Sequence, residues 1–159
     1  MSPETSAERT LVILKPDAVQ RAIAGELIGR FERRGLRIAA LRMLKVDRAM
    51  AEKHYEIHKG KFFYEDLVKV ISASPVIAFV LEGPNAIAAV RAMVGATRPH
   101  EAAPGSIRGD YALVGLRNLV HASDAPATAE SEIRLWFPEG VLAYRRDVDK
   151  WMSEDKAPS

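Results

Sequence analysis

Apolar and polar positions alternate along this chain in patterns that predict both strands and helices. Residues 10–14 form a short apolar run that ends at Lys15-Pro16-Asp17, which is typical of a buried strand stopped by proline. A second apolar run, residues 75–81, ends at Glu82-Gly83-Pro84 and predicts another strand. Residues 36–46 are rich in aliphatic side chains with basic residues between them, and we interpret them as a long strand.

Helical spacing appears between these strands. Ile23, Leu27 and Phe31 recur at intervals of four residues, and Gly35 follows as a terminating residue. Residues 48–58 and 63–72 predict two short helices, and residues 85–94 predict another. A last helix is expected from Pro126, with Ala129, Ile133 and Trp136 forming its apolar face.

Residues 97–110 show no periodicity and contain two prolines and two glycines. An irregular loop of this length inside a compact domain is usually functional. Residues 111–114 then predict a strand that leads towards His121. With the extra helices set aside, the order is βαββαβ, which predicts an α+β fold: a ferredoxin-like sandwich with a four-stranded antiparallel sheet and helices packed on it.

The composition is that of an ordinary globular protein. The 159 residues are 48% hydrophobic and 28% charged, and we expect one domain, 1–159, with polar ends at about 1–8 and 153–159. No apolar run approaches the roughly 20 residues that cross a bilayer, and the first residues lack the apolar segment of a signal peptide. The chain has no cysteine, so a cytoplasmic location is expected.

The charge balance excludes little by itself. A net charge of +2 without a dense basic tract does not favour nucleic-acid binding. A nucleic-acid-binding sheet of this fold would carry aromatic residues on its central strands. The two clearest strand segments contain one aromatic residue, Phe79, which disfavours this function.

The richest chemistry lies around His121, which follows a short apolar run. Asn118, Ser123 and Asp124 flank it, and the predicted last helix carries Glu132. A neutral imidazole is a good nucleophile near pH 7 when a partner fixes which ring nitrogen keeps the proton. The alternative is a histidine that ends a strand and forms only a local hydrogen bond.

Several anion-binding side chains sit at predicted turns and in the long loop. Arginine and lysine together with a hydroxyl suit a polyphosphate, although each residue alone is more simply a solvated surface group. The set contains Lys15, Arg91, Thr97, Arg108 and Asn118. These residues converge only if the strand ends meet, and the chain has no Walker-type glycine loop.

Aromatic and histidine residues between 54 and 67 allow two interpretations. Phe63 can stack on a planar base, but its spacing with Leu67 is equally that of a helical core face. Tyr55 fits a core position with a solvated hydroxyl. His54 and His58 lie four residues apart without a third ligand nearby in sequence, so we expect them at the surface, and His100 receives no role.

Lys15-Pro16-Asp17, the turn at Arg108-Gly109-Asp110 and residues 118–124 together resemble the nucleoside diphosphate kinase family. The resemblance runs from about Glu8 to Trp151. It implies ping-pong transfer of a γ-phosphoryl group from a nucleoside triphosphate to a nucleoside diphosphate. His121 matches the phosphorylated histidine, Glu132 the acid that holds its other ring nitrogen, and Ser123 the neighbouring hydroxyl.

The same resemblance implies the remaining binding residues and partners. Six residues match those that bind the phosphates and sugar in the family: Lys15, Tyr55, Arg91, Thr97, Arg108 and Asn118. Phe63 matches the aromatic that stacks on the base and Leu67 its apolar neighbour. Mg²⁺ is implied on the nucleotide phosphates with little direct protein ligation, Asp124 reaching it through water. A homo-oligomer is implied, with a hexamer favoured over a tetramer because the tail, with Tyr144 and Trp151, resembles that of the longer hexameric members.

Four differences from the family pattern stand out. Ala18 and Ala122 stand where glycine is usual, so the first position needs no positive φ. Gly115-Leu116 replaces an aliphatic residue followed by glycine, and Ala125 replaces a serine that caps the next helix. A non-catalytic nucleotide-binding module on the same fold is the alternative to an enzyme; the presence of His121, Lys15 and Glu132 favours the enzyme.

Overall fold

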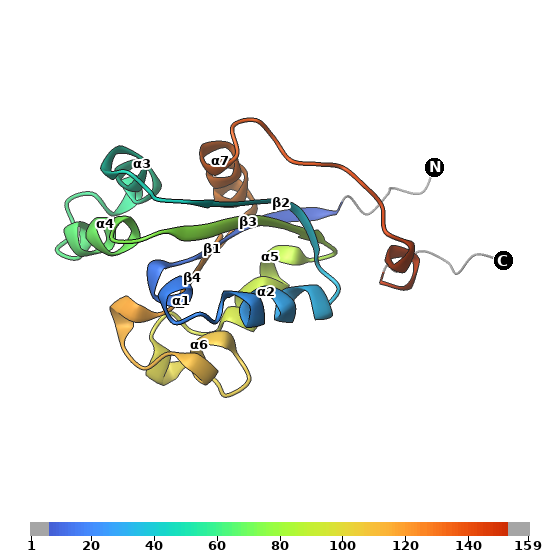
Figure 1. Cartoon of the computed structure of the whole chain (residues 1–159), viewed down its shortest axis with the longest axis horizontal. Coiled ribbons are helices and arrows are strands. Elements are labelled where there is room, and N and C mark those ends of the chain that lie inside the picture. Colours follow the sequence, from blue (N-terminus) through green and yellow to red (C-terminus); the bar gives the residue numbers. More distant parts are fainter. Residues whose placement is uncertain (1–6, 153–159) are drawn as a thin grey trace.

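A computed structural model describes residues 7–152 and contains one antiparallel sheet. Its strands are β1 (Glu8–Leu14), β2 (Arg37–Leu44), β3 (Val76–Gly83) and β4 (Val120–Ala122). They lie in the order β2-β3-β1-β4, so that the first strand of the chain occupies the middle of the sheet (Figure 1). The predicted α+β fold with a four-stranded antiparallel sheet is confirmed, and structures of similar chains share it.

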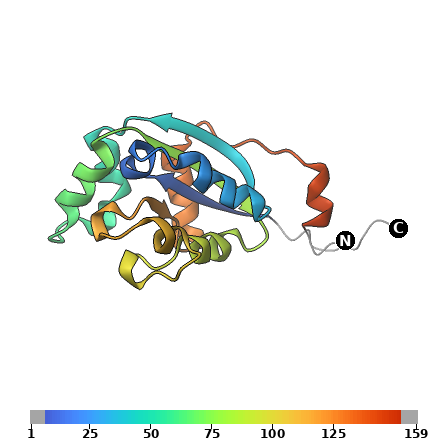
Figure 2. The same ribbon diagram turned by 60° about the horizontal axis from the view of Figure 1, so that its bottom comes forward.

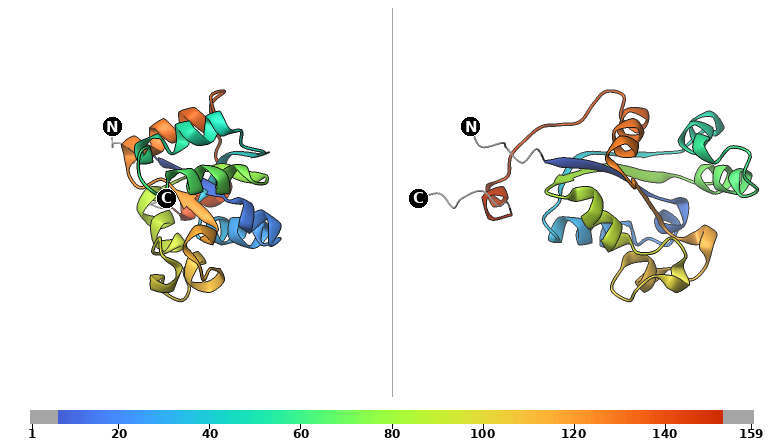
Figure 3. Two further views of the ribbon diagram at one scale, coloured as in Figure 1. Left: turned by 90° about the vertical axis from the view of Figure 1, so that its left-hand side faces the viewer. Right: turned by 180° about the vertical axis from the view of Figure 1, so that it is seen from behind.

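Helices cover both faces of this sheet (Figures 1 and 3). One face carries α2 (Ala24–Arg33), α5 (Ala86–Val94) and, farther out, α6 (Ile107–Tyr111), and the other carries α3 (Arg48–His54), α4 (Tyr64–Ser72) and α7 (Pro126–Trp136). The short helix α1 (Pro16–Gln20) follows β1 directly. Turns of 3₁₀ helix complete the structure: η1 (Glu56–His58), η2 (Pro99–Glu101), η3 (Gly115–Arg117) and η4 (Asp147–Trp151).

The central strand shows why two cores form. Side chains of β1 alternate between the faces, so Val12 and Leu14 join the core under α2 and α5, while Leu11 and Ile13 join the core under α3, α4 and α7. All four side chains are fully buried. A strand buried on both faces has a continuous apolar run, which is the pattern of residues 10–14.

Three predicted elements are wrong in detail. The segment 97–110 is not structureless, because it contains η2 and the start of α6. Residues 111–114 are not a strand: Tyr111 ends α6, and the fourth strand is β4, which begins six residues after Val114. The helix expected over 48–58 breaks at Tyr55 and continues as η1. Serine and proline at helix starts explain α6 and η2, since Ser106 accepts a hydrogen bond from the Gly109 amide and Pro99 occupies a first-turn position.

The segment after α7 runs back along the outer edge of β2 and ends in η4 (Figure 2). A β-bulge between Ile38 and Ala40 leaves the Ala39 carbonyl outside the β2–β3 ladder, and the Leu142 amide donates to it at 2.9 Å. The Tyr144 hydroxyl donates to the Ile38 carbonyl. Within the described residues, no helix is long and apolar enough to cross a membrane.

Candidate active site

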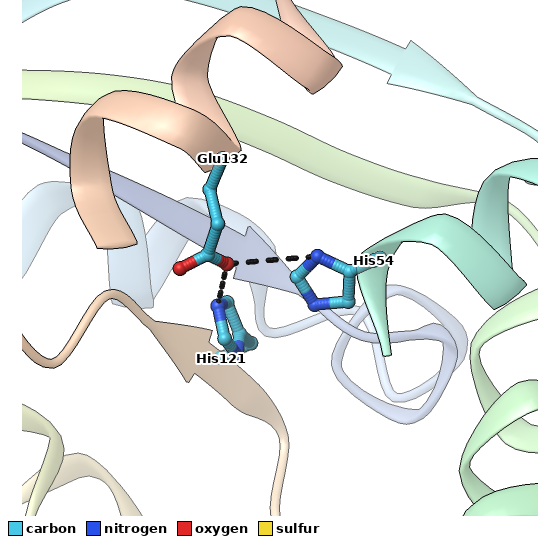
Figure 4. A group of neighbouring side chains, drawn as sticks. All are labelled: His54, His121 and Glu132. Carbon is cyan, nitrogen blue, oxygen red and sulfur yellow. Dashed lines mark hydrogen bonds and ion pairs between the residues drawn. The ribbon is translucent and has the colours of Figure 1, made fainter. Parts of the chain in front are cut away.

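His121 is the central residue of β4 and lies opposite Ile13 of β1. Its neighbours Val120 and Ala122 point into the core under α5, so strand alternation turns His121 to the other face, towards α3 and α7. The ring nitrogen Nε2 is hydrogen-bonded to Glu132 Oε2 (Figure 4). A carboxylate only accepts, so Nε2 carries the proton and the Nδ1 lone pair is left for chemistry. The side chain is 26% exposed, which lets a substrate reach it.

Glu132 reaches this histidine from the buried side of α7. Pro126 occupies the first turn of the helix, and Ala129, Glu132 and Trp136 follow at helical spacing on the face that packs against the sheet. Oε2 of Glu132 binds His121, whereas Oε1 is buried and has no hydrogen-bond partner among the described residues. A rigid helix therefore fixes the orientation and the tautomer of the His121 ring.

His54 is the main surprise, because the expectation that it lies at the surface is wrong. Its side chain is 1% exposed, and its ring meets the ring of His121 edge-on with centroids 4.5 Å apart. Trp136 Nε1 donates to His54 Nδ1 at 3.1 Å, so Nδ1 is unprotonated and the ring is neutral. Burial lowers the pKa of His54 well below its usual value, and charge on His121 would lower it further. His58, by contrast, is partly buried and contacts Lys61.

Lys15 stands at the end of β1 with its ammonium enclosed by backbone and amide groups. Nζ donates to Asn118 Oδ1 at 2.9 Å and to the Leu116 carbonyl at 3.3 Å. Burial lowers the pKa of Lys15 to about 8, with Arg108 and Arg117 acting in the same direction and Asp17 against it. The site therefore holds a cation that has lost its water and gains from an incoming anion.

The backbone before β4 is held in an unusual conformation. Leu119 has φ 72°, in the left-handed region that bulky residues rarely adopt. Its amide donates to Asp17 Oδ2 at 2.9 Å, and its carbonyl accepts from the Lys15 amide at 2.8 Å. The end of β1 and the start of α1 thus clamp Leu119, which aims Asn118 at Lys15 while β4 begins one residue later.

Arg108 connects the long loop to the site through three carbonyl groups. Its guanidinium donates to the carbonyls of Gly95 (3.0 Å), Asn118 (3.2 Å) and Val120 (2.6 Å). Burial, and next the charge of Arg91, lower the pKa of Arg108 to about 10. Arg91 itself donates to the carbonyl of Ala122, the residue next to His121. Two guanidinium groups therefore lie near the backbone of β4.

Asn118 connects Thr97, the last of the predicted anion-binding residues, to this group. Its Nδ2 donates to the Thr97 carbonyl at 3.2 Å, while its Oδ1 accepts from Lys15. The structure thus brings together Lys15, Arg91, Thr97, Arg108 and Asn118, which are far apart in the sequence. Gly109 permits this packing, because a Cβ there would stand 2.0 Å from the Ala103 carbonyl oxygen.

The aromatic candidates separate into a core residue and a surface residue. Tyr55 is buried in the core under α3 and α4, and burial followed by the charge of Glu132 raises the pKa of its hydroxyl. Phe63 precedes α4 and stays outside both cores, with the rings of Phe62 and His58 at 5.2 and 5.3 Å. Leu67 packs partly against the core beside it. Phe63 is therefore available for stacking, which helical spacing alone left open.

The hydroxyl and acid that follow His121 differ in exposure. Ser123 is fully buried, and its Oγ accepts from the Leu11 amide at 3.3 Å. Asp124 is exposed. Gly115 and Leu116 form part of η3 without positive φ, and the Leu116 carbonyl contributes the second acceptor for Lys15. The replaced pair therefore still offers a backbone contact at the site.

Three residues at the site had no role in the sequence interpretation: His54, Asp17 and the indole N–H of Trp136. The sequence did contain one signal for His54, which is the spacing of its neighbours. Ala51 lies three residues before His54 and Tyr55 lies one after it, so all three share one helical face, and Ala51 and Tyr55 are buried. Asp17 lies within a motif, but its bond to Leu119 spans 102 positions and has no local signature.

Most of this chain is similar to known proteins. The family model described as "Nucleoside diphosphate kinase" matches residues 8–141. The chain is 51% identical to the nucleoside diphosphate kinase of Pelotomaculum thermopropionicum over 148 residues, which is 92% of this chain and 99% of that protein. It is 52% identical to that of Pyrococcus furiosus over 153 residues, with 94% and 95% covered. Among solved structures, a halophilic nucleoside diphosphate kinase from Halobacterium salinarum in complex with CDP matches with TM-score 0.91 and 40% identity, covering 93% of this chain and 99% of that one.

Proposed function

Because this chain belongs to the nucleoside diphosphate kinase family, we propose that it transfers a γ-phosphoryl group by a ping-pong mechanism through a phosphohistidine at His121. The hydrogen bond from His121 Nε2 to Glu132 carries this proposal. It fixes the tautomer in which Nδ1 is the free nucleophile, and it holds the remaining ring proton during both half-reactions.

The first half-reaction exchanges one P–O bond for a P–N bond, and the second half-reaction reverses that exchange. In the first, Nδ1 of His121 attacks the γ-phosphorus, the bond to the β–γ bridging oxygen breaks, and the nucleoside diphosphate leaves with the electron pair. In the second, a terminal oxygen of another diphosphate attacks the phosphohistidine and the N–P bond breaks. Nε2–H stays on the ring throughout, facing Glu132.

Charge stabilisation is assigned to the cations gathered near β4. Phosphoryl transfer depends mainly on positioning and on neutralising the phosphate oxygens. Lys15 and the two guanidinium groups of Arg91 and Arg108 supply the charge, and the desolvation of Lys15 and Arg108 makes an anion especially favourable. Thr97, Asn118 and Tyr55 are assigned to the phosphates and sugar, and Ser123 to the vicinity of the nucleophile.

Base binding is assigned to Phe63, with Leu67 beside it. Stacking uses a π-face that every base has, so we propose broad tolerance of purine and pyrimidine nucleotides. Discharge of the phosphoenzyme by GDP, CDP and UDP at rates within about tenfold is expected, which is about 1.4 kcal/mol of discrimination. Use of guanine nucleotides with refusal of cytosine nucleotides would contradict this role of Phe63.

Mg²⁺ is proposed to act on the nucleotide rather than in a protein cage. Magnesium prefers oxygen ligands, and the only cluster of three potential metal ligands among residues 7–152 contains two imidazoles. The exposed carboxylate of Asp124 suits contact through water. When bound, Mg²⁺ neutralises phosphate oxygens; Lys15, Arg91 and Arg108 orient the same group from the protein side.

We also propose a homo-oligomer, and a hexamer over a tetramer by the resemblance of the tail. Leu41 and Met43 on the edge strand β2 are half or more exposed, as is Trp151 in η4. An edge strand with exposed apolar side chains favours burial against a second copy. Native mass spectrometry is expected to give six subunits. A single domain and a cytoplasmic location stay predictions, tested by one unfolding transition and by cell fractionation.

Intact-mass spectrometry after brief mixing with ATP and Mg²⁺ tests the central proposal. The protein is expected to gain one acid-labile phosphoryl group, to lose it on addition of GDP, and to gain none as His121→Ala. His100→Asn is the matched control, because the His100 side chain is exposed and lies beside Glu101. Nucleotide binding without labelling would instead favour a regulatory nucleotide-binding module.

A further inference from the structure

We propose that His54, His121 and Glu132 form a binding site for a divalent ion of the zinc class, and that this ion, when bound, blocks phosphorylation of His121. The blocking effect rests on the function proposed above, whereas the binding site stands on geometry alone. The site differs from that of Mg²⁺ in its ligands, its position and its effect.

The three potential ligand atoms lie close together and come from three different elements. His54 Nδ1 at the end of α3, His121 Nε2 on β4 and Glu132 Oε2 on α7 all lie within 4.8 Å of one another (Figure 4). Ligands of a tetrahedral Zn²⁺ at about 2.0–2.1 Å stand roughly 3.3 Å apart. His54 Nδ1 and Glu132 Oε2 are 3.5 Å apart, so this pair already has the required spacing.

The donor set matches zinc and excludes magnesium as the natural occupant. Two imidazole nitrogens and one carboxylate oxygen suit Zn²⁺, Ni²⁺ or Co²⁺, and three protein ligands leave a fourth position for water. His54 is neutral, since Nδ1 accepts from Trp136, and a neutral imidazole is the form that binds a metal. Glu132 Oε1 and His54 Nε2 are buried without partners among the described residues, so polar capacity at this cluster is unused.

Binding exchanges two hydrogen bonds for three coordinate bonds. The ion takes the Nδ1 lone pair that now accepts from Trp136, and it replaces the proton between His121 and Glu132. A neutral imidazole keeps one proton when it binds a metal, so the His121 proton moves from Nε2 to Nδ1. Trp136 loses its hydrogen-bond acceptor, which makes its indole emission a direct reporter of the event.

The ion and the phosphoryl group compete through the same imidazole. An attack by Nδ1 places positive charge on the ring, which Glu132 stabilises through the Nε2 proton. A divalent cation on Nε2 moves that proton to Nδ1, occupies the carboxylate and leaves the ring without a free lone pair. The metal-bound ring is consequently no nucleophile, and zinc inhibits at His121 itself rather than at the residues assigned to the phosphates, sugar and base.

Metal binding is measured first without nucleotide, by Zn²⁺ competition against a chromophoric chelator and by the visible absorption of added Co²⁺. His54→Asn keeps an acceptor for Trp136 but lacks the imidazole, and we expect its Zn²⁺ dissociation constant to rise at least about tenfold. His100→Asn is expected to bind Zn²⁺ like the unaltered chain. In a Trp151→Phe background, Zn²⁺ is expected to shift Trp136 emission and Co²⁺ to give the intense bands of a tetrahedral site.

Equal Zn²⁺ affinity of His54→Asn and His100→Asn would overturn the proposal, as would an octahedral Co²⁺ spectrum. If His54→Asn does not fold, the Trp151→Phe chain decides, because Zn²⁺ binding that leaves Trp136 emission unchanged contradicts a ligand role of His54 Nδ1. Phosphohistidine formation is followed in a separate experiment. That experiment contains Mg²⁺ and ATP, and a zinc-selective chelator removes Zn²⁺. Failure there contradicts the proposed function and leaves the binding measurement interpretable.

Discussion

Replacing Lys15 by methionine is expected to stabilise the folded protein at pH 7 while removing a cation that we propose binds phosphate. Lys15 is 4% exposed, and the fall of its pKa from the usual 10.5 to about 8 corresponds to about 3 kcal/mol of unfavourable burial. Methionine removes that cost but leaves Asn118 Oδ1 without its donor, which costs about 1–2 kcal/mol. The net expectation is a gain of about 1–2 kcal/mol, or roughly 3–6 °C in Tm for a chain of this size.

The pH dependence gives this prediction its sign. The folded-state pKa of Lys15 lies below the unfolded-state value, so the unfolded chain binds the proton more tightly. The destabilisation is complete below about pH 8 and disappears as pH rises from 8 to 10.5. The advantage of Lys15→Met over the unaltered chain is therefore largest at pH 7 and shrinks across that window.

Chemical denaturation at a series of pH values from 7 to 10 measures the difference. Lys59→Met is the matched control, because Lys59 is exposed and the same substitution there is expected to change the free energy of unfolding by less than about 0.5 kcal/mol. A less stable Lys15→Met protein at pH 7, or a stability difference that does not vary with pH, would refute the reasoning. Phosphohistidine formation is expected to be lost in the same variant.

Three further predictions address catalysis and packing. The rate of phosphohistidine formation at low ATP should fall as pH rises through about 8, because Lys15 loses its proton. Asp17→Asn should move this fall in rate to lower pH, since the Asp17 charge raises the Lys15 pKa. A fall at the same pH in both proteins would contradict the assignment. Gly109→Ala should cost about 3 kcal/mol or more in urea denaturation, because its Cβ would meet the Ala103 carbonyl oxygen at 2.0 Å, and an unchanged midpoint would count against it. Ala125→Ser should raise Tm by supplying the missing cap of α7, worth on the order of 1 kcal/mol, whereas no rise would show that Pro126 already orders that turn.

Stability and function oppose each other at this site. Buried cations, the left-handed Leu119 and the orphan oxygen of Glu132 all cost folding free energy. The same features prepare the site for an anion, because desolvated charge and preset dipoles act most strongly on a group that brings no water. Substitutions that relax any of them are expected to trade activity for stability.

The sequence by itself determined the class of fold and most of the chemical inventory. Apolar runs identified β1 and β3, helical spacing identified α2 and α7, and the motif around His121 identified the family, because these signals lie within a few neighbouring residues. The elements at 97–114 were misjudged, since a capped helix of five residues leaves almost no periodic signal.

Only the tertiary structure decided how the candidate residues meet. Lys15 contacts Asn118 across 103 positions and His54 meets His121 across the sheet edge, and no local pattern encodes such contacts. Burial also set the pKa values of Lys15 and Arg108, because desolvation depends on what packs around a group and not on its neighbours in sequence. The residue types determined which chemistry was available. The pairing of β4 with β1 determined which side chains lie close enough to take part in it.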